Sequence, residues 1–160
     1  MKIAYILSTL RNTGPVNGLY NRLKYMNRDK FQPIIVTLSE EPENTLINKF
    51  HELKVPIFQL GLSRIDGFLK GPSVLKQLLS KEKPDIIHTH GLRADMLSAR
   101  YLNGYKRCST MHNYPIHDYV MKYGRFRGTI MARQQFKAIK KIEYGVACSK
   151  SIAAMFQKHG

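Results

Sequence analysis

The sequence predicts an α/β fold in which strands and helices alternate along 160 residues. Short runs rich in Ile, Val and Leu recur along the chain, and most are followed by a polar turn. Between these runs, apolar residues recur at three- and four-residue spacing, which is typical of amphipathic helices. Such alternation favours parallel strands joined by right-handed crossovers. We therefore predict one Rossmann-like, doubly wound domain over residues 1–160, with a mostly parallel six-stranded sheet and helices on both faces.

Six segments have the length and apolar content of strands, and the fourth leads into a group of polar side chains. Its apolar residues Ile86 and Ile87 are followed by His88, Thr89 and His90. Ligands of open α/β sheets bind outside the carboxyl ends of the strands, so we expect His90 to lie in a binding site. For His88, packing against a neighbour is an equally good interpretation. The predicted strands are residues 2–8, 33–38, 55–60, the segment from 86, 107–111 and 144–148.

A polar loop follows the first predicted strand and leads into a helix. Thr13 is the expected N-cap, and Pro15 lies in the first turn. Backbone N–H groups at a helix N-terminus attract anions, which makes Gly14 and Pro15 candidates for a phosphate contact. The loop contains neither the dinucleotide fingerprint nor the P-loop motif, so a tight turn without a ligand is the alternative.

Apolar periodicity predicts further helices at residues 45–53, 73–83, 93–102, 129–142 and 151–158. Residues 67–72 contain two glycines and a proline and are expected to form a surface loop. Ser149 is the expected cap of the last helix. The fifth predicted strand ends at His112, so His90 and His112 should face one cleft if their strands are neighbours. A histidine that only packs or caps at the strand end is the alternative for His112.

The chain is strongly basic, with 26 Lys and Arg against 11 Asp and Glu and a net charge of +15. Residues 81–160 contain 15 basic and 5 acidic side chains, hence +10. The basic helix predicted at 129–142 either packs on the core with a solvated basic face or lies on an anionic membrane surface. Nucleic acid is another polyanion that this charge would attract, but no recognition motif is present, and we expect no specific nucleic-acid binding.

Two cysteines, Cys108 and Cys148, each lie in a predicted buried strand, so we expect free thiols in a reducing cytoplasm. The apolar run after Lys2 is too short for a signal peptide, and no segment reaches the length of a membrane-spanning helix. We therefore expect a cytoplasmic protein. His88 and His90, with His112 or His117, are the alternative ligands of a zinc ion, but no cysteine motif supports them, and no metal is expected.

Four segments, in their order and spacing, resemble the N-terminal domain of family 4 glycosyltransferases, which are retaining enzymes with the GT-B fold. The segments are residues 2–6 with the Gly14-Pro15 loop, residues 84–90, residues 109–112 and residues 145–149. The resemblance covers essentially all of residues 1–160. It implies that this domain binds the acceptor, while a C-terminal domain, absent from this chain, holds the nucleotide-sugar. The family's donor-binding pair of glutamates, separated by seven residues, does not occur here.

The resemblance also implies a role for each candidate residue. His112 matches the histidine that contacts the transferred sugar and is the expected catalytic residue. Gly14, with Pro15, would approach the donor phosphates. Asn113 stands where the family commonly has an acidic residue, and Pro15 follows Gly14 where a second glycine is common. The expected acceptor-binding residues are Asn12, Thr13, Asn17, His90, Arg93, Asn113 and Ser149.

The predicted function is therefore transfer of a sugar from a nucleotide-sugar to a polysaccharide or lipid-linked acceptor, in polysaccharide biosynthesis at the inner membrane face. No cofactor is expected, because the nucleotide-sugar is a substrate. The isolated domain is expected to be inactive and to self-associate through its exposed cleft face. The alternatives are a non-catalytic binding module for anionic lipid or nucleic acid, and a coenzyme-binding Rossmann protein, against which the missing glycine fingerprint counts.

Overall fold

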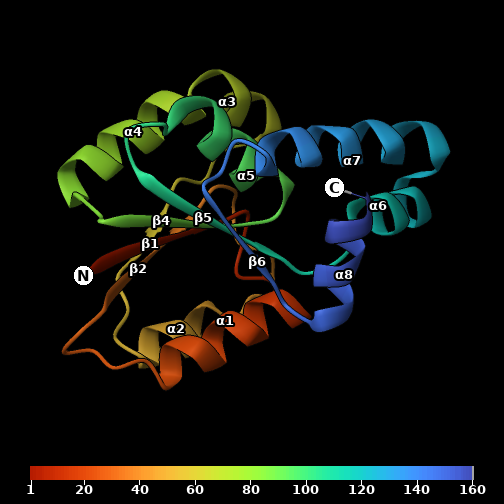
Figure 1. Cartoon of the computed structure of the whole chain (residues 1–160). Helices are drawn as coiled ribbons and strands as arrows, with labels where there is room; N and C mark the ends of the chain where they lie inside the picture. Colours follow the sequence, from red (N-terminus) through yellow and green to blue (C-terminus); the bar gives the residue numbers. More distant parts are fainter. Residues whose placement is uncertain (160) are drawn as a thin grey trace. The chain divides into compact units, whose positions relative to one another are not determined.

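The computed structural model describes residues 1–159, except the side chains of Arg64, Ile65, Phe68 and His159. Strands and helices alternate along most of the chain (Figure 1). The strands are β1 (Lys2–Leu7), β2 (Gln32–Thr37), β3 (Ile57–Gln59), β4 (Ile86–His90), β5 (Lys106–Met111) and β6 (Tyr144–Ala147). The helices are α1 (Gly14–Lys24), α2 (Ile47–Glu52), α3 (Arg64–Leu69), α4 (Gly71–Glu82), α5 (Leu92–Tyr101), α6 (Pro115–Tyr123), α7 (Arg125–Ile139) and α8 (Lys150–His159).

The strands form one six-stranded sheet in the order β3-β2-β1-β4-β5-β6. β1 pairs in parallel with β2, β2 with β3, and β5 with β6. This is the strand order of a doubly wound Rossmann sheet, in which the chain starts at the centre and winds outward in both directions. The predicted fold class is confirmed. Because β4 and β5 are neighbours, their carboxyl ends lie side by side.

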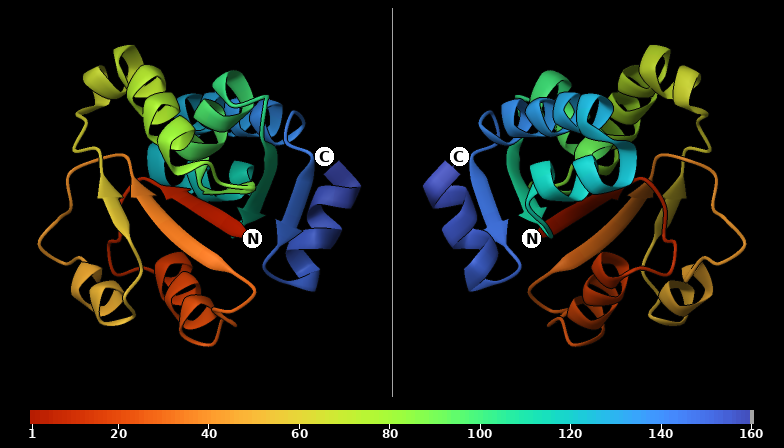
Figure 2. Two further views of the ribbon diagram at one scale, coloured as in Figure 1. Left: turned by 90° about the vertical axis from the view of Figure 1, so that its left-hand side faces the viewer. Right: turned by 90° about the vertical axis from the view of Figure 1, so that its right-hand side faces the viewer.

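The first compact unit, Met1–His88, is built on β1, β2 and β3. In this unit, α1 and α2 cover one face of the strands, and α3 and α4 cover the other (Figure 2). Strands covered on both faces need apolar side chains in both directions, which explains the near-continuous Ile and Val of β1 and β2. Leu19 of α1 and Phe50 of α2 belong to the core cluster. His88 is buried with its ring centroid 5.1 Å from that of Tyr5, as the packing interpretation requires.

The second compact unit begins at Thr89. In it, α5 and α6 each pack against α7 (Figure 1). α6 and α7 are joined at Gly124, whose φ of +78° suits a residue without a Cβ. Gly128 lets the two helices touch through their backbones, because a Cβ there would lie 2.6 Å from the Cα of Val120.

Residues 67–72 do not form the predicted surface loop. α3 extends to Leu69, and α4 begins at Gly71, so Lys70 alone separates them. The hydroxyl of Ser63 accepts a hydrogen bond from the backbone N–H of Asp66 at 3.0 Å and caps α3. Such a cap offsets the unfavourable helix propensity of one glycine.

The basic helix predicted at 129–142 also has different bounds, since α7 runs from Arg125 to Ile139. The predicted helix begins only after Gly128, but the missing side chain of this glycine is what admits the neighbouring helix α6. Ala132, Gln135 and Ala138 of α7 are buried. Most of this helix therefore packs on the core of its unit.

Both cysteines are free thiols, but only one of them is shielded. Cys108 lies on β5 and is half-buried, whereas Cys148 follows the end of β6 and is exposed. The prediction of a buried thiol is thus wrong for Cys148, because β6 is the edge strand of the sheet. Within the described part of the chain, every helix is too short or too polar to cross a membrane.

Candidate functional site

Two histidines meet at the carboxyl ends of β4 and β5. His90 is the last residue of β4, and His112 directly follows β5. The Nδ1 atom of His90 lies 2.9 Å from the Nε2 atom of His112, and the two rings are stacked with centroids 5.2 Å apart. In such a contact one ring nitrogen donates and the other accepts, so at least one ring is neutral. We call these two residues the histidine pair.

The backbone on either side of the histidine pair is held by hydrogen bonds. Gly91 has a φ of +87° and occupies the N-cap of α5, where its carbonyl accepts from the N–H of Asp95 at 3.0 Å. The carbonyl of His112 accepts from the Sγ of Cys148 at 3.2 Å. The turn after β4 and the loop after β5 are therefore both tied to neighbouring elements.

A buried carboxylate, Asp95 of α5, joins these two strands to the helices. Its Oδ1 atom accepts from the hydroxyl of Thr89 at 2.6 Å and from that of Ser109 at 2.8 Å. Its Oδ2 atom accepts from the side-chain amide of Gln135 at 2.9 Å, and the Oε1 atom of Gln135 accepts from Tyr119 at 2.5 Å. We call these five residues the Asp95 network.

Burial controls the electrostatics of the Asp95 network. The side chain of Asp95 is fully buried, and this desolvation raises the pKa of its carboxyl, although the three hydrogen bonds that it accepts act in the opposite direction. Burial, together with the nearby charge of Asp95, also raises the pKa of Tyr119. The partners of Asp95 are two hydroxyls and one amide, and none of them is a cation.

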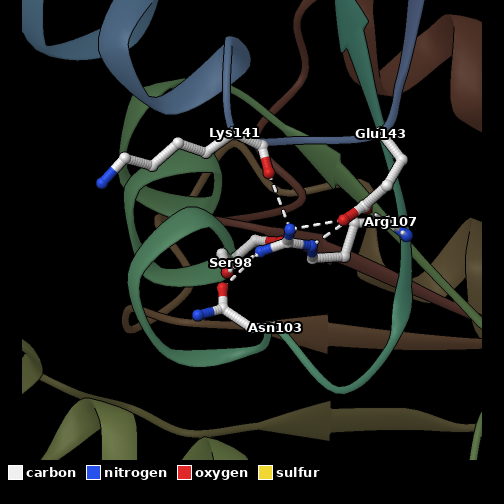
Figure 3. A network of polar contacts seen from close by, with 5 residues as sticks. All are labelled: Ser98, Asn103, Arg107, Lys141 and Glu143. Carbon is white, nitrogen blue, oxygen red and sulfur yellow. Dashed lines mark hydrogen bonds and ion pairs between the residues drawn. The ribbon is translucent and has the colours of Figure 1, made fainter.

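A second polar network lies at the start of β5 and surrounds Arg107, which is 4% exposed (Figure 3). Its guanidinium donates to both carboxylate oxygens of Glu143, at 3.0 and 2.5 Å. It also donates to the carbonyls of Ser98 and Lys141 and to the side chain of Asn103, at 3.0, 2.6 and 2.8 Å. The hydrogen bonds from Arg107 lower the pKa of Glu143 to about 2. We call these residues the Arg107 network.

In the first unit, the loop after β1 is held by a glutamate that the sequence does not single out. Both carboxylate oxygens of Glu41 accept from the N–H of Leu10, at 3.0 and 2.9 Å. The hydroxyl of Thr45 donates to the same carboxylate at 2.6 Å. Further along, the side-chain amide of Asn17 donates to the Oδ1 atom of Asn12 at 2.9 Å. The loop is thus ordered by its own side chains and by the segment after β2.

The predicted phosphate-contacting residues lie at the exposed start of α1. The helix begins at Gly14, and Pro15 occupies its first turn. Thr13 is the N-cap residue, as predicted, but its hydroxyl makes no capping hydrogen bond. A Cβ added at Gly14 would meet no heavy atom within 4 Å. The internal packing of the chain therefore does not require glycine at this position.

The predicted site residues of the second unit are only partly in contact. His90 and His112 meet, as expected for neighbouring strands. Asn113 follows His112 and is exposed, and Arg93 is half-buried in the first turn of α5. The hydroxyl of Ser149 accepts from the N–H of Ile152 at 3.2 Å, so its predicted capping role is confirmed. The roles of all these residues toward substrates stay predictions.

Sequence reasoning missed the Asp95 network and the contact of Glu41 with the first loop. For Asp95 a signal existed, since this acidic residue lies beside Ala94 and close to Leu97 and Ser98, all of which are buried. A carboxylate on a buried helix face requires several hydrogen-bond donors, which predicts a polar network but not its members. Among the side chains that the structure describes, no three of His, Cys, Asp or Glu form a group that could hold a metal ion.

Comparisons with known proteins show the family. The model of Glycosyltransferase Family 4 matches residues 13–160. No curated protein sequence matches the chain.

Solved structures share the fold at low sequence identity. The complex of S. aureus MnaA with UDP has a TM-score of 0.70 and 16% identity, with 99% of this chain and 42% of that one covered. A glycosyltransferase from Rickettsia africae ESF-5 has a TM-score of 0.64 and 18% identity, with coverages of 98% and 39%. UDP-GlcNAc 2-epimerase from Neisseria meningitidis, bound to UDP-GlcNAc, has a TM-score of 0.64 and 10% identity, with coverages of 99% and 43%. The chain thus spans less than half the length of each.

Proposed function

Because the chain belongs to glycosyltransferase family 4, we propose that it forms the acceptor-binding part of an enzyme that transfers a sugar from a nucleotide-sugar with retention of configuration. The acceptor is a polysaccharide or a lipid-linked glycan. The donor is held mainly by a nucleotide-binding domain outside these residues, so this part alone is inactive. Two structures of similar fold contain UDP or UDP-GlcNAc, which supports a nucleotide-sugar as the donor.

The observation that carries this proposal is the histidine pair at the ends of β4 and β5. During glycosyl transfer the bond from the anomeric carbon to the diphosphate breaks, while an acceptor oxygen bonds to that carbon and loses its proton. Hydrogen-bonding groups that are already oriented stabilise such a charge-separated transition state better than mobile ones. Stacking and the contact of 2.9 Å hold His112 in one orientation, in which it binds the transferred sugar. His90 supports that orientation and, with Arg93, Asn113 and Ser149, binds the acceptor.

The start of α1 supports a contact with the donor phosphates. Backbone N–H groups of a first helical turn have no partner within the helix and attract negative charge. At Gly14 there is no side chain, and the surrounding space is open, so an anionic group has access to the backbone. Asn12, Thr13 and Asn17 then face the acceptor beside this loop.

Substitutions in the product of the intact gene test the proposal. We expect His112→Ala to lower kcat by about 100-fold, as is usual for the loss of one oriented polar group. Gly14→Ala is expected to raise KM for the nucleotide-sugar about 10-fold, because its methyl group occupies the space of the phosphate. Gly18→Ala is the matched control, since Gly18 lies in α1, is exposed and also has open space around it. Transfer is measured with a panel of UDP- and GDP-sugars. Wild-type transfer by both His112→Ala and Gly14→Ala would refute the proposed site.

A lipid-linked acceptor requires access to a membrane, and the turn between α6 and α7 supports peripheral attachment at the inner membrane face. Met121 is 87% exposed and Phe126 is 80% exposed, and Tyr123 lies between them. Basic residues accompany these apolar ones along α6 and α7, namely Lys122, Arg125, Arg127 and Arg133. The sequence placed the membrane contact on residues 129–142, where Ile130 is 42% exposed, and the most exposed apolar side chains of the second unit lie just before that range, around Gly124. Apolar insertion combined with basic contacts is how interfacial helices bind anionic lipid.

Vesicle binding tests this attachment. The protein should cosediment with vesicles that contain phosphatidylglycerol, more strongly at low salt than at high salt. Met121→Ser with Phe126→Ser should weaken binding at every salt concentration, whereas Arg125→Gln with Arg127→Gln should mainly reduce the salt dependence. Absence of binding at low salt would contradict the membrane proposal.

The second candidate function is a non-catalytic binding module for a polyanion, which the net charge of +15 favours. In that case, anionic lipid or nucleic acid would bind with a steep salt dependence, and no nucleotide-sugar or glycan would change the binding.

Light scattering tests the predicted self-association of the isolated domain, which should appear as a dimer or larger species.

A further inference from the structure

We propose that Asp95 is the positioning residue of the histidine pair, because its carboxylate clamps the ends of β4 and β5 together and so keeps His90 and His112 in hydrogen-bond contact. The importance of this clamp for catalysis rests on the proposed function. The clamp itself is a property of the fold and can be measured without any substrate.

The clamp depends on one oxygen atom. Oδ1 of Asp95 accepts from Thr89, the residue immediately before His90, at 2.6 Å and from Ser109, three residues before His112, at 2.8 Å. The same hydroxyl oxygen lies 3.3 Å from the carbonyl oxygen of Cys108 on β5. Two adjacent strands are thus connected through a single carboxylate oxygen close to the point where each one ends.

Side-chain alternation explains how this contact orients the histidines. Successive side chains of a strand point to opposite faces, so Thr89 is anchored on one face while His90 projects from the other. A hydrogen bond to Thr89 therefore holds the backbone of the strand end without occupying the space of the imidazoles. Displacement of β4 along β5 by a fraction of an ångström would lengthen the contact of 2.9 Å between the two rings.

The second carboxylate oxygen connects the clamp to two helices. Oδ2 accepts from the amide of Gln135 on α7, and Gln135 accepts from Tyr119 on α6. Because the amide of Gln135 is satisfied on both sides, Asp95 is held in one orientation by α6 and α7. The buried side chains of this network leave the carboxylate no contact with solvent, so it cannot turn away from the strands.

An asparagine at position 95 is a conservative variant that should preserve the clamp. Its side-chain oxygen can still accept from Thr89 and Ser109, while its NH2 group faces Gln135. A rotation of the Gln135 amide by about 180° then presents Oε1 to Asn, and the hydroxyl of Tyr119 turns to accept instead of donate. An alanine at position 95 can make none of these contacts.

The test is the hydrogen bond of the histidine pair, observed by NMR in protein labelled with 15N-histidine. At about pH 8, where unperturbed imidazoles are neutral, an N–H···N bond gives a scalar coupling between Nδ1 of His90 and Nε2 of His112. We expect this coupling to be lost in Asp95→Ala and retained in Asp95→Asn. The signals of His51 and His117 should not change, and Glu143→Gln, in the Arg107 network, is the matched carboxylate control and should retain the coupling.

A second variant decides the question even if Asp95→Ala does not fold. Thr89→Val with Ser109→Ala removes both hydroxyls and leaves Asp95 in place, and it should also abolish the coupling. Retention of the coupling in this double variant, or in a folded Asp95→Ala protein, would overturn the proposal. If the coupling is lost while glycosyl transfer stays at the wild-type rate, the clamp is upheld and the proposed role of the histidine pair fails.

Discussion

Two carboxylates of the second unit, Asp95 and Glu143, contact the same strand and have opposite electrostatic properties. Asp95 reaches Ser109 near the end of β5, is fully buried, and has neutral partners. Glu143 reaches Arg107 near the start of β5, and its side chain is 44% exposed. Burial raises the pKa of Asp95, whereas hydrogen bonds from Arg107 lower the pKa of Glu143 to about 2. The pKa of each carboxyl is therefore set by its hydrogen-bond partners and its access to water, and not by the type of residue.

The comparison also separates two ways of joining elements. In the Arg107 network, the buried charge is the guanidinium of Arg107, which stays protonated at every relevant pH, while the carboxylate of Glu143 remains near water. The cost of desolvation therefore falls mainly on a group that does not titrate. The Asp95 network places a titratable charge in the interior and stabilises it with neutral donors. We expect the first arrangement to contribute more to stability, and we expect the two arrangements to respond to pH in opposite directions.

The largest effect is expected from breaking the Arg107 network. Arg107→Met has a similar side-chain length but leaves the carbonyls of Ser98 and Lys141 and the side chain of Asn103 without their donor. We expect a loss of about 3–5 kcal/mol in the free energy of unfolding, typical of a buried charge network that loses one partner. Urea denaturation followed by circular dichroism measures it. Arg107→Lys should lose about half as much, because an ammonium group cannot reach all of these acceptors. If Arg107→Met lowered the free energy of unfolding by less than about 1 kcal/mol, the Arg107 network would not be the larger contributor to stability.

A smaller effect is expected from moving the helices that hold Asp95. Gly128→Ala places a methyl group against the backbone of Tyr119 and Val120, so α6 must move away from α7. We expect a loss of about 1–3 kcal/mol, as for other overpacked positions, and weaker contact between Tyr119 and Gln135. The matched control is Gly18→Ala in α1, where the new methyl group meets open space. That variant should be stabilised by about 0.5–1 kcal/mol, since alanine favours helix. Equal effects at the two glycines would show that α6 and α7 are not in close contact.

The smallest effects are differences in how stability depends on pH, and they should have opposite signs. Glu143 has a folded pKa below its ordinary 4.5, so its stabilisation is present above pH 4.5 and lost as the pH falls toward 2. Asp95 has a folded pKa above its ordinary 3.8, so its contribution is present below pH 3.8 and lost as the pH rises through the raised value.

Unfolding free energies of the wild type, Glu143→Gln and Asp95→Asn between pH 2 and about 8 measure these contributions. Relative to Glu143→Gln, the wild type should gain stability with rising pH, by no more than about 1 kcal/mol because Glu143 is partly exposed. Relative to Asp95→Asn, the wild type should lose stability with rising pH. If the two stability differences changed with pH in the same direction, burial would not be what sets the pKa of Asp95.

Much of the fold could be predicted from the sequence. Apolar runs of strand length and helical periodicity arise from local geometry, and they placed all six strands and most helices within a few residues. The errors occurred where a contact between distant residues outweighed a local preference. The basic helix was predicted to begin only after Gly128, because the neighbour of this glycine in α6 cannot be inferred locally. The error at α3 is of another kind, since the cap at Ser63 is a local signal that was overlooked.

The candidate site was predicted in part. The position of His90 and His112 at strand ends follows from the chain order, since polar residues after a buried run mark the carboxyl end of a strand. Their hydrogen bond does not follow from the sequence, because it requires β4 and β5 to be neighbours with one particular alignment. The contact of Glu41 with the first loop could not be predicted either, because Glu41 and Leu10 are 31 residues apart and meet only in the folded chain.

The amino-acid sequence by itself determined the alternation of strands and helices, the basic charge and the ends of the strands at which polar groups gather. These properties depend on residues close together in the chain, whose periodicity and charge can be read directly. Only the tertiary structure decided which polar groups meet. Asp95 and Gln135 are 40 residues apart and hydrogen-bond at 2.9 Å because α5 and α7 pack together. Burial there excludes water, so each polar atom must find a protein partner, and the packing of the whole unit selects that partner.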